Sequence, residues 1–199
     1  MKKSVFQNSL VVAIMLSCMA LNATGATITE SVLAKASEPM KFILSTSSIK
    51  SEKVRCTIIS EEGRQVYADR INTEKVSSRL FDMSNLPVGT YTVEIEDDLK
   101  IDQYQLIVHE NSIELSQNAD EICKPVFNMM PERKVGMTLL SLGNDVKVEL
   151  SDGSDVFYTL RVNEQDAIQK VFDTDHLPKG KYHFKIVTSD RVFYHSVNI

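Results

Sequence analysis

The stretch at residues 81–91, Phe-Asp-Met-Ser-Asn-Leu-Pro-Val-Gly-Thr-Tyr, returns at residues 172–182 as Phe-Asp-Thr-Asp-His-Leu-Pro-Lys-Gly-Lys-Tyr. Both copies read F-D-x-x-x-L-P-x-G-x-Y, without a gap and 91 positions apart. A motif that recurs within one chain predicts two copies of the same structural unit.

The motif itself predicts a strand, a turn and a second strand. Asp82 and Asp173 can each accept a hydrogen bond from the backbone two residues on, and so begin a turn. Pro and Gly at the second and fourth positions of Leu-Pro-x-Gly favour a type I turn there. Apolar side chains then alternate along residues 91–95 and 182–186. This period of two is typical of a half-buried antiparallel strand.

A Tyr that opens a strand just after such a turn resembles the tyrosine corner of immunoglobulin-like sandwiches. We therefore expect Tyr91 and Tyr182 to be buried, because both lie on the apolar face of their strand. Each hydroxyl should bond to backbone near its own turn, since a buried phenol needs a partner. The chain has no Trp and no Cys near either Tyr, so the disulfide and buried Trp of antibody domains are missing.

Short runs with strand periodicity and turn signals between them occupy most of both halves of the chain. They lie at residues 40–44, 54–59, 65–71, 77–82, 89–96, 101–108, 137–140, 146–150, 156–162, 167–172, 182–187 and 191–199. This pattern predicts an all-β fold of two tandem antiparallel β-sandwich modules, residues 27–111 and 112–199. Between the copies, Pro125 and Pro131 argue against a central strand.

Residues 1–26 have the features of a secretory signal peptide. Lys2 and Lys3 form the basic start, residues 10–21 are the apolar run, and small residues precede a cleavage site after Ala26. The apolar run is too short to span a bilayer. A loose lipobox ending at Cys18 leaves open an alternative, in which the mature protein is a lipoprotein.

Removal of the signal peptide takes away Lys2 and Lys3 and no acidic residue, so the net charge changes from −5 to −7. An acidic exported chain is a poor candidate for binding nucleic acid or an anionic membrane surface. Two cysteines remain. Export permits a disulfide, but Cys56 lies within a predicted strand and Cys123 between the modules, which favours two buried thiols.

The motifs of common enzymes and cofactor sites are missing from the sequence. There is no G-x-S-x-G, no H-E-x-x-H and no phosphate-binding Gly loop. We therefore expect a protein that is not an enzyme, with no cofactor. His183 and His195 are predicted to face opposite sides of their sheet and so not to form a metal site, because too few ligands converge.

Two acidic turns stand out as possible cation sites. The first contains Glu94, Glu96, Asp97, Asp98 and Asp102, which lack the D-x-D-x-D-G spacing of a calcium loop. We expect it to be a solvated hairpin end. The second, residues 151–155, contains Asp-Gly and is predicted to be a hairpin turn with a solvated acidic surface.

Four aromatic residues, Phe157, Tyr158, Phe193 and Tyr194, fall on predicted strands of the second module. They could line a face that binds a glycan or a peptide. Aromatic residues on strands are more often core or cross-strand partners, and this is the reading that we prefer.

Residues 54–108 resemble the small β-sandwich domains of proteins exported by bacteria that use type IX secretion. The resemblance rests on the alternation of Val54, Cys56 and Ile58, on Glu-Gly-Arg-Gln-Val-Tyr at residues 62–67, and on Leu-Pro-Val-Gly-Thr-Tyr-Thr-Val at residues 86–93. Two groups share this pattern: the C-terminal sorting domains of type IX cargo, and a family of uncharacterised exported immunoglobulin-like proteins.

These observations predict an exported, non-enzymatic structural or interaction module in the periplasm or at the cell surface. Its partner would be a protein or glycan of the cell envelope. The alternative that the resemblance implies is a sorting or secretion-associated role in type IX secretion.

Overall fold

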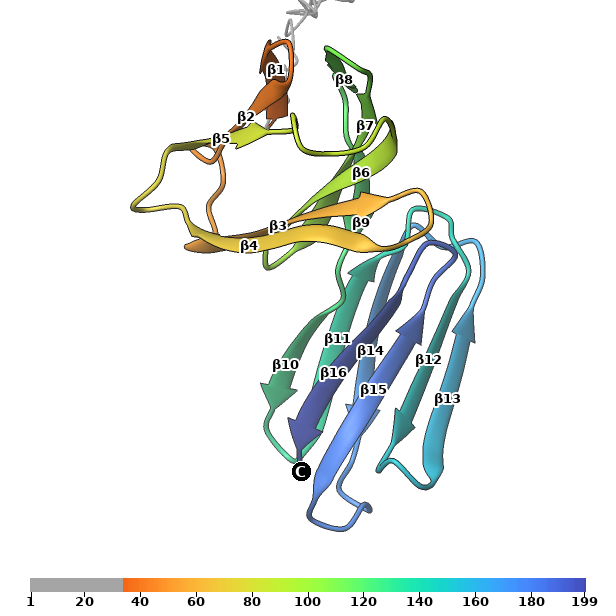
Figure 1. Cartoon of the computed structure of the whole chain (residues 1–199). Helices are drawn as coiled ribbons and strands as arrows, with labels where there is room; N and C mark the ends of the chain where they lie inside the picture. The colour runs from red at the N-terminus through yellow and green to blue at the C-terminus, as the bar shows by residue number, and fades with distance from the viewer. Residues whose placement is uncertain (1–33) are drawn as a thin grey trace, which may run out of the picture. The chain divides into compact units, whose positions relative to one another are not determined.

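The computed structural model describes residues 34–199, which form sixteen β-strands and no helix (Figure 1). The predicted signal peptide, residues 1–26, and the alternative lipidation site at Cys18 lie outside the described residues. All strand pairs are antiparallel. This confirms the predicted all-β fold class of tandem sandwiches. Within residues 34–199, no helix is long and apolar enough to cross a membrane.

The first sandwich has a three-stranded sheet in the order β1-β2-β5 and a larger sheet in the order β4-β3-β6-β7-β8. A further strand, β9, pairs with the beginning of β7. The strands are β1 (Ala34–Glu38), β2 (Lys41–Ser45), β3 (Lys53–Ser60), β4 (Gln65–Asn72), β5 (Ser78–Asp82), β6 (Gly89–Glu96), β7 (Lys100–Val108), β8 (Ile113–Leu115) and β9 (Asp120–Cys123).

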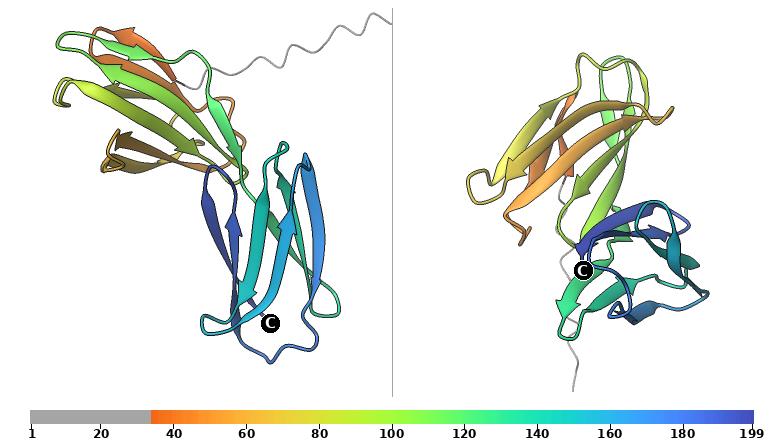
Figure 2. Two further views of the ribbon diagram at one scale, coloured as in Figure 1. Left: turned by 90° about the vertical axis from the view of Figure 1, so that its right-hand side faces the viewer. Right: turned by 90° about the horizontal axis from the view of Figure 1, so that it is seen from below.

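The second sandwich has a three-stranded sheet in the order β10-β11-β14 and a four-stranded sheet in the order β13-β12-β15-β16. Figure 2 shows its two layers of strands from two further directions. The strands are β10 (Val126–Met130), β11 (Lys134–Leu140), β12 (Val146–Ser151), β13 (Val156–Val162), β14 (Ala167–Asp173), β15 (Lys181–Val187) and β16 (Val192–Asn198).

The two sandwiches repeat one strand order. In each, the first, second and fifth strands form the smaller sheet, and the fourth, third, sixth and seventh strands follow one another in the larger sheet. This is an immunoglobulin-like arrangement in which the fourth strand pairs with the third instead of the fifth. Even the irregularity recurs, because the pairing of the third and fourth strands shifts register after Ile58 in one copy and after Leu150 in the other.

Each sandwich has a hydrophobic core of its own between its two sheets. Alternate residues of the strands point inward, as they must in a sheet with one buried face. The predicted inward sets of β6 and β15 are buried: Tyr91, Val93 and Ile95, and Tyr182, Phe184 and Ile186. Val54, Cys56 and Ile58 of β3 are also buried, as predicted.

Residues 113–123 form strands of the first sandwich. β8 pairs with the end of β7 and β9 with its beginning, whereas the sequence reading placed this segment in the module at 112–199. The first strand of the second sandwich is β10, which within residues 34–199 pairs only with β11. Pro125 directly precedes β10 and Pro131 directly follows it, and this edge position agrees with the prediction drawn from them.

The repeated motif folds as two successive turns. As predicted, the Asp82 carboxylate accepts a hydrogen bond from the Ser84 amide at 2.9 Å, and Asp173 does the same for Asp175 at 3.0 Å. The turn that follows lies three residues earlier than predicted. Its closing hydrogen bond runs from the Leu86 amide to the carbonyl of Met83, at 2.9 Å, because the carboxylate contact has already reversed the chain there.

Both motif tyrosines are buried, with 6% of Tyr91 and 3% of Tyr182 exposed. The Tyr91 hydroxyl donates to the carbonyl of Pro87 at 2.8 Å, and the Tyr182 hydroxyl to the carbonyl of Pro178 at 3.0 Å. This confirms the predicted corner in both copies. Each hydrogen bond satisfies a phenol hydroxyl that burial has removed from water.

Candidate functional site

The acidic residues of the hairpin between β6 and β7 are used by the protein itself. Asp97 Oδ1 accepts hydrogen bonds from the amides of Leu99 and Lys100, at 2.7 and 2.8 Å, and thereby caps the turn. Glu96 forms an ion pair with Lys124, with 2.8 Å between Oε1 and Nζ. These two carboxylates thus stabilise the hairpin and its connection to the following segment.

Two of the acidic residues are buried, and here the prediction of a solvated hairpin end was wrong. Only 7% of Glu94 and 5% of Asp102 are exposed. The Gln103 amide donates to Glu94 Oε1 at 2.8 Å, and Lys100 Nζ lies 3.0 Å from Asp102 Oδ1. Lys100 offsets part of the desolvation of Asp102, although burial still raises the pKa of that carboxyl, and the Gln103 amide satisfies one oxygen of Glu94.

Lys100 joins Asp102 to the neighbouring strand β9, because its ammonium also contacts Glu121. Burial lowers the pKa of Lys100, but the hydrogen bonds that its ammonium donates to Glu121 and Asp102 outweigh this effect and raise that pKa above its ordinary value. The cation that these carboxylates hold is therefore a lysine side chain. Within residues 34–199, no group of three or more His, Cys, Asp or Glu side chains is placed to hold a metal ion.

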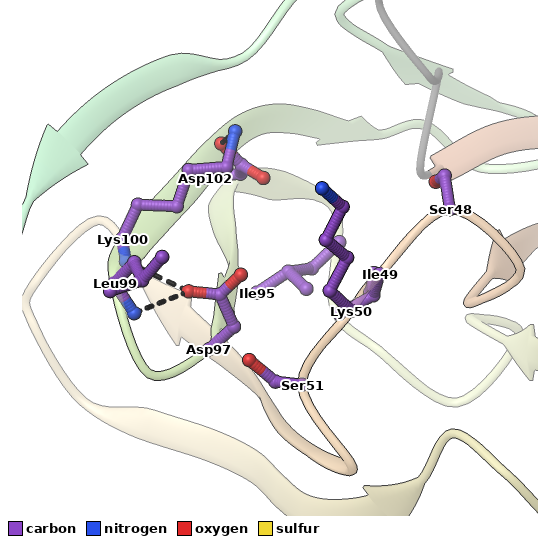
Figure 3. A pocket seen from close by; sticks show the side chains of 9 residues that line it. All are labelled: Ser48, Ile49, Lys50, Ser51, Ile95, Asp97, Leu99, Lys100 and Asp102. Carbon is purple, nitrogen blue, oxygen red and sulfur yellow. Dashed lines mark hydrogen bonds and ion pairs between the residues drawn. The ribbon is translucent and has the colours of Figure 1, made fainter.

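A pocket of about 220 Å³ lies beside this hairpin (Figure 3). Its walls come from the hairpin and from residues 48–51, which lead into β3. Figure 3 shows Asp97 bonded to the turn backbone, with Lys100 and Asp102 on the same wall. On that wall Lys100 is paired with Asp102 and Asp97 caps the turn, while Lys50, from residues 48–51, adds a further cationic side chain to the lining.

The two histidines of the second sandwich face opposite sides, as predicted. In the pairing of β15 with β16, His195 lies opposite Phe184, whereas His183 lies opposite Ser196. The His195 ring stacks on Phe127 at a centroid distance of 4.2 Å, and burial lowers its pKa. His183 Nδ1 lies 2.9 Å from the Ser196 hydroxyl. His195 therefore packs against β10 of the other sheet, whereas His183 has its hydrogen-bonding partner on the neighbouring strand β16.

Both cysteines of the described chain are free thiols. Cys56 is fully buried, and burial raises the pKa of its thiol to about 12. Cys123 is only half-buried, which differs from the prediction of two buried thiols, because β9 lies at the margin of its sheet. Its Sγ is 3.8 Å from Glu121 Oε1, and burial together with this carboxylate raises the pKa of the thiol.

The second acidic turn is a hairpin turn, as predicted. Asp152 Oδ1 accepts hydrogen bonds from the amides of Ser154 and Asp155, at 2.8 and 2.9 Å. Gly153 has φ +100°, a left-handed conformation that favours glycine. The carboxylate that could have bound a cation is thus engaged in forming the turn.

The four aromatic residues divide between core and surface. Phe193 packs against the core of the second sandwich, whereas Tyr194 is largely exposed. Phe157 and Tyr158 belong to both classes. The Phe157 ring contacts Tyr182 of the core and the Tyr158 ring contacts Phe172 of the core, yet both side chains remain partly exposed. The prediction that these aromatic residues are core or cross-strand partners therefore agrees with their ring contacts. It did not include the aromatic surface that remains exposed.

That surface borders a groove of about 340 Å³ in the second sandwich. The groove lies where β13 and β14, which belong to different sheets, come together at one side of the sandwich. Phe157 and Tyr158 form one wall, residues 170–173 the other, and His176 and Leu177 of the repeated motif close one end. The sequence identified the aromatic residues but could not show that they face the neighbouring sheet edge.

Comparison with known proteins shows what the first sandwich is similar to. Residues 38–109 match the family model of the secretion system C-terminal sorting domain, which spans less than half of the 199-residue chain. This confirms the resemblance predicted for residues 54–108. The comparison with curated proteins found no match.

Among solved structures, a two-domain fibronectin type III segment from chicken tenascin is similar at 11% identity and a TM-score of 0.31. It covers 83% of this chain and 96% of the tenascin segment. The BSP domain of a biofilm associated protein is similar at 15% identity and a TM-score of 0.29, over 83% of this chain and 29% of the other. Both scores are low, and the fold assignment rests on the strand order of residues 34–199.

Proposed function

We propose that the protein is an exported, non-enzymatic interaction protein whose first sandwich acts as a sorting module for type IX secretion. The observation that carries the proposal is the match of residues 38–109 to the sorting-domain family. The partners of the buried charges support a structural role for them. Asp102 and Glu94 are held by Lys100 and Gln103 inside one sheet, an arrangement that stiffens a recognition module.

The sorting role can be tested by transferring the module to a reporter. A fluorescent protein would be placed between a signal peptide and residues 34–123, and expressed in a bacterium with type IX secretion and in a strain that lacks it. We expect the reporter at the outer surface of the first strain, where added protease removes it, and in the periplasm of the second. Residues 124–199 in the same position are the matched control and should leave the reporter in the periplasm.

A reporter that stays in the periplasm of both strains would contradict sorting by the first sandwich. The second candidate is then an interaction module that remains in the envelope and binds a protein or a glycan there. Its supporting observation is the second sandwich, which follows the sorting-type sandwich in this sequence and has an exposed aromatic groove. Fractionation of the full chain distinguishes the two, because only sorting delivers it to the outer surface.

A further inference from the structure

The two sandwiches place equivalent residues at one side of each fold, where the fourth and fifth strands meet. Tyr67 of β4 and Tyr158 of β13 occupy the same position, opposite Ile58 and Leu150 in their ladders. The Tyr67 ring meets Phe81 edge to face at 5.4 Å, and the Tyr158 ring meets Phe172 in the same way at 5.1 Å. One sandwich can therefore serve as the reference for the other.

In the first sandwich this side is closed by a polar bridge between the two sheets. Arg79 of β5 forms an ion pair with Asp69 of β4, with 2.6 Å between Nη1 and Oδ2. The Tyr67 hydroxyl donates to the same carboxylate oxygen at 3.2 Å. The cation on one sheet thus has its carboxylate on the other.

In the second sandwich the cation is kept, but the carboxylate at the position of Asp69 is missing; the Asp173 carboxylate, which accepts from the Asp175 amide, lies on the same groove wall as Lys170. The sequence offset of 91 that aligns the motifs places Lys170 at the position of Arg79, and Leu160 at the position of Asp69. The Lys170 ammonium lies over the Tyr158 ring, 6.0 Å from its centroid. None of the ion pairs in residues 34–199 includes Lys170.

The same side of the second sandwich is more apolar along β13, and it has free strand edges as the first sandwich does. Phe157 of the groove and its neighbour Val156 stand where the first sandwich has Val66 and Gln65. The exposed fraction is 58% for Val156 and 49% for Val171 on the opposite wall, whose counterpart Leu80 in the first sandwich is 52% exposed. Within residues 34–199, β13 pairs only with β12 and β14 only with β11. Each therefore keeps a row of backbone N–H and C=O groups without a strand partner.

We propose that this groove binds an extended peptide segment of another protein that carries an Asp or Glu side chain between apolar ones. The peptide backbone pairs with a free strand edge, as in other proteins that bind a peptide by adding a strand to a sheet. Its apolar side chains cover Val156, Phe157 and Val171, and its carboxylate pairs with Lys170. The ligand then supplies the group that Asp69 supplies in the first sandwich.

The ring geometry favours a peptide over a glycan. Sugars bind aromatic residues by stacking on an open ring face, but the face of Tyr158 is taken by the Lys170 ammonium and its ring meets Phe172 edge to face. A carboxylate next to Lys170 adds charge complementarity to the apolar contacts without displacing either ring. This inference does not depend on the sorting role proposed for the first sandwich.

The test begins with the full chain, purified after export and used to select from a phage-displayed library of random heptapeptides. We expect the enriched peptides to alternate apolar residues with a single Asp or Glu, and synthetic copies to bind in a fluorescence anisotropy titration. A selection without enrichment, or one that enriches peptides without an acidic residue, would overturn the proposal. So would binding in a glycan array by a protein that selects no peptide.

Three variants then locate the binding. Lys170→Glu should lower the affinity for a selected acidic peptide by about tenfold or more, because a charge-assisted hydrogen bond is lost. The same variant should bind a copy of that peptide in which Lys replaces the acidic residue. Leu160→Asp should also lower the affinity for the acidic peptide, because the new carboxylate would pair with Lys170 as Asp69 pairs with Arg79 in the first sandwich. Arg79→Glu is the matched control and should leave the affinity unchanged.

Equal losses from Arg79→Glu and Lys170→Glu would overturn the proposal, since they would indicate a general effect of net charge. Leu160 packs partly against the core, so Leu160→Asp can fail to fold. The charge-reversal pair of Lys170→Glu with the Lys-containing peptide keeps the proposal falsifiable in that case. If the reversed pair does not restore binding, Lys170 does not contact the acidic side chain and the proposal fails.

Discussion

At the scale of single residues, Tyr91 and Tyr182 tie the start of a strand to the turn before it. Each phenol is buried and has one hydrogen bond, to the carbonyl of Pro87 or Pro178. We expect Tyr→Phe at either position to lower the free energy of unfolding by about 0.5–1.5 kcal/mol, the usual contribution of one hydrogen bond. Urea denaturation of the single variants measures this.

Tyr→Ala at the same positions removes the ring as well and leaves a cavity. By analogy with Phe→Ala, the expected loss is about 3–5 kcal/mol. Changes below about 1 kcal/mol for Tyr→Ala at both positions would contradict the corner, because only surface substitutions are usually that small.

The two cysteines within residues 34–199 are predicted to differ in reactivity. Burial raises the pKa of Cys56 to about 12, so at pH 8 its thiol is protonated and shielded, and iodoacetamide should modify Cys123 alone. Mass spectrometry after a short reaction of the folded protein measures the labelling of each. Modification of Cys56 at the rate seen for the urea-unfolded chain would contradict its burial.

The same shift gives a pH dependence with a definite sign. The folded-state pKa of Cys56 lies above the ordinary value of 9.0. Its contribution to stability is therefore complete below about pH 9 and is lost as the pH rises toward 12. Denaturation at pH 8 and pH 10 should show this loss, and a Cys56→Ala variant should show less of it.

Residues that follow a local rule were predicted correctly, and residues that depend on distant partners were not. The Tyr positions follow from a motif of eleven residues, because the turn, the strand and the acceptor are all nearby. The burial of Glu94 and Asp102 depends on which strands lie beside them, and Lys100 and Glu121 join only after β9 has paired with β7. From the sequence alone, these acidic residues near a hairpin turn were predicted to be solvated, because charged side chains usually lie at the surface.

At the scale of elements, alternation located twelve of the sixteen strands of residues 34–199, and the strands that it missed, β1, β8, β9 and β10, lie where alternation is weak. β6 and β13 begin and end at the predicted residues. The short strands β8 and β9 contain too few residues for a clear period, so the sequence could not assign them to a sheet. The groove of the second sandwich could not be predicted from the sequence either, because it depends on which strand edges of the two sheets lie next to each other.

The pairing of β8 and β9 with β7 leads to a prediction about fragments. Residues 124–199 contain all the strands of the second sandwich and should fold with about the same stability as residues 112–199, within roughly 0.5 kcal/mol. For the first sandwich, residues 34–123 should be more stable than residues 34–111, which lack both strands and leave β7 unpaired on one side. Thermal melts and amide spectra of the four fragments test this. A fragment 34–111 as stable as 34–123 would contradict it.

At the scale of the whole molecule, the chain contains two separate hydrophobic cores. One is built from residues between 42 and 113 and the other from residues between 135 and 197. The sorting-type match lies within the first, and the peptide groove that we propose lies within the second. Recognition by an export system and binding of a peptide would thus use sandwiches whose cores do not share residues.

Separate cores predict separate unfolding. We expect calorimetry of the full chain to show two transitions, and Tyr→Phe at one corner to lower only one of them. For a domain of this size the shift should be about 4–8 °C per kcal/mol of lost stability. Tyr91→Phe should then move one transition and Tyr182→Phe the other, each by several degrees, while the double variant should show both shifts, because distant independent sites add. If either single variant moves both transitions, or if one shared transition is observed, the two sandwiches unfold as one cooperative unit.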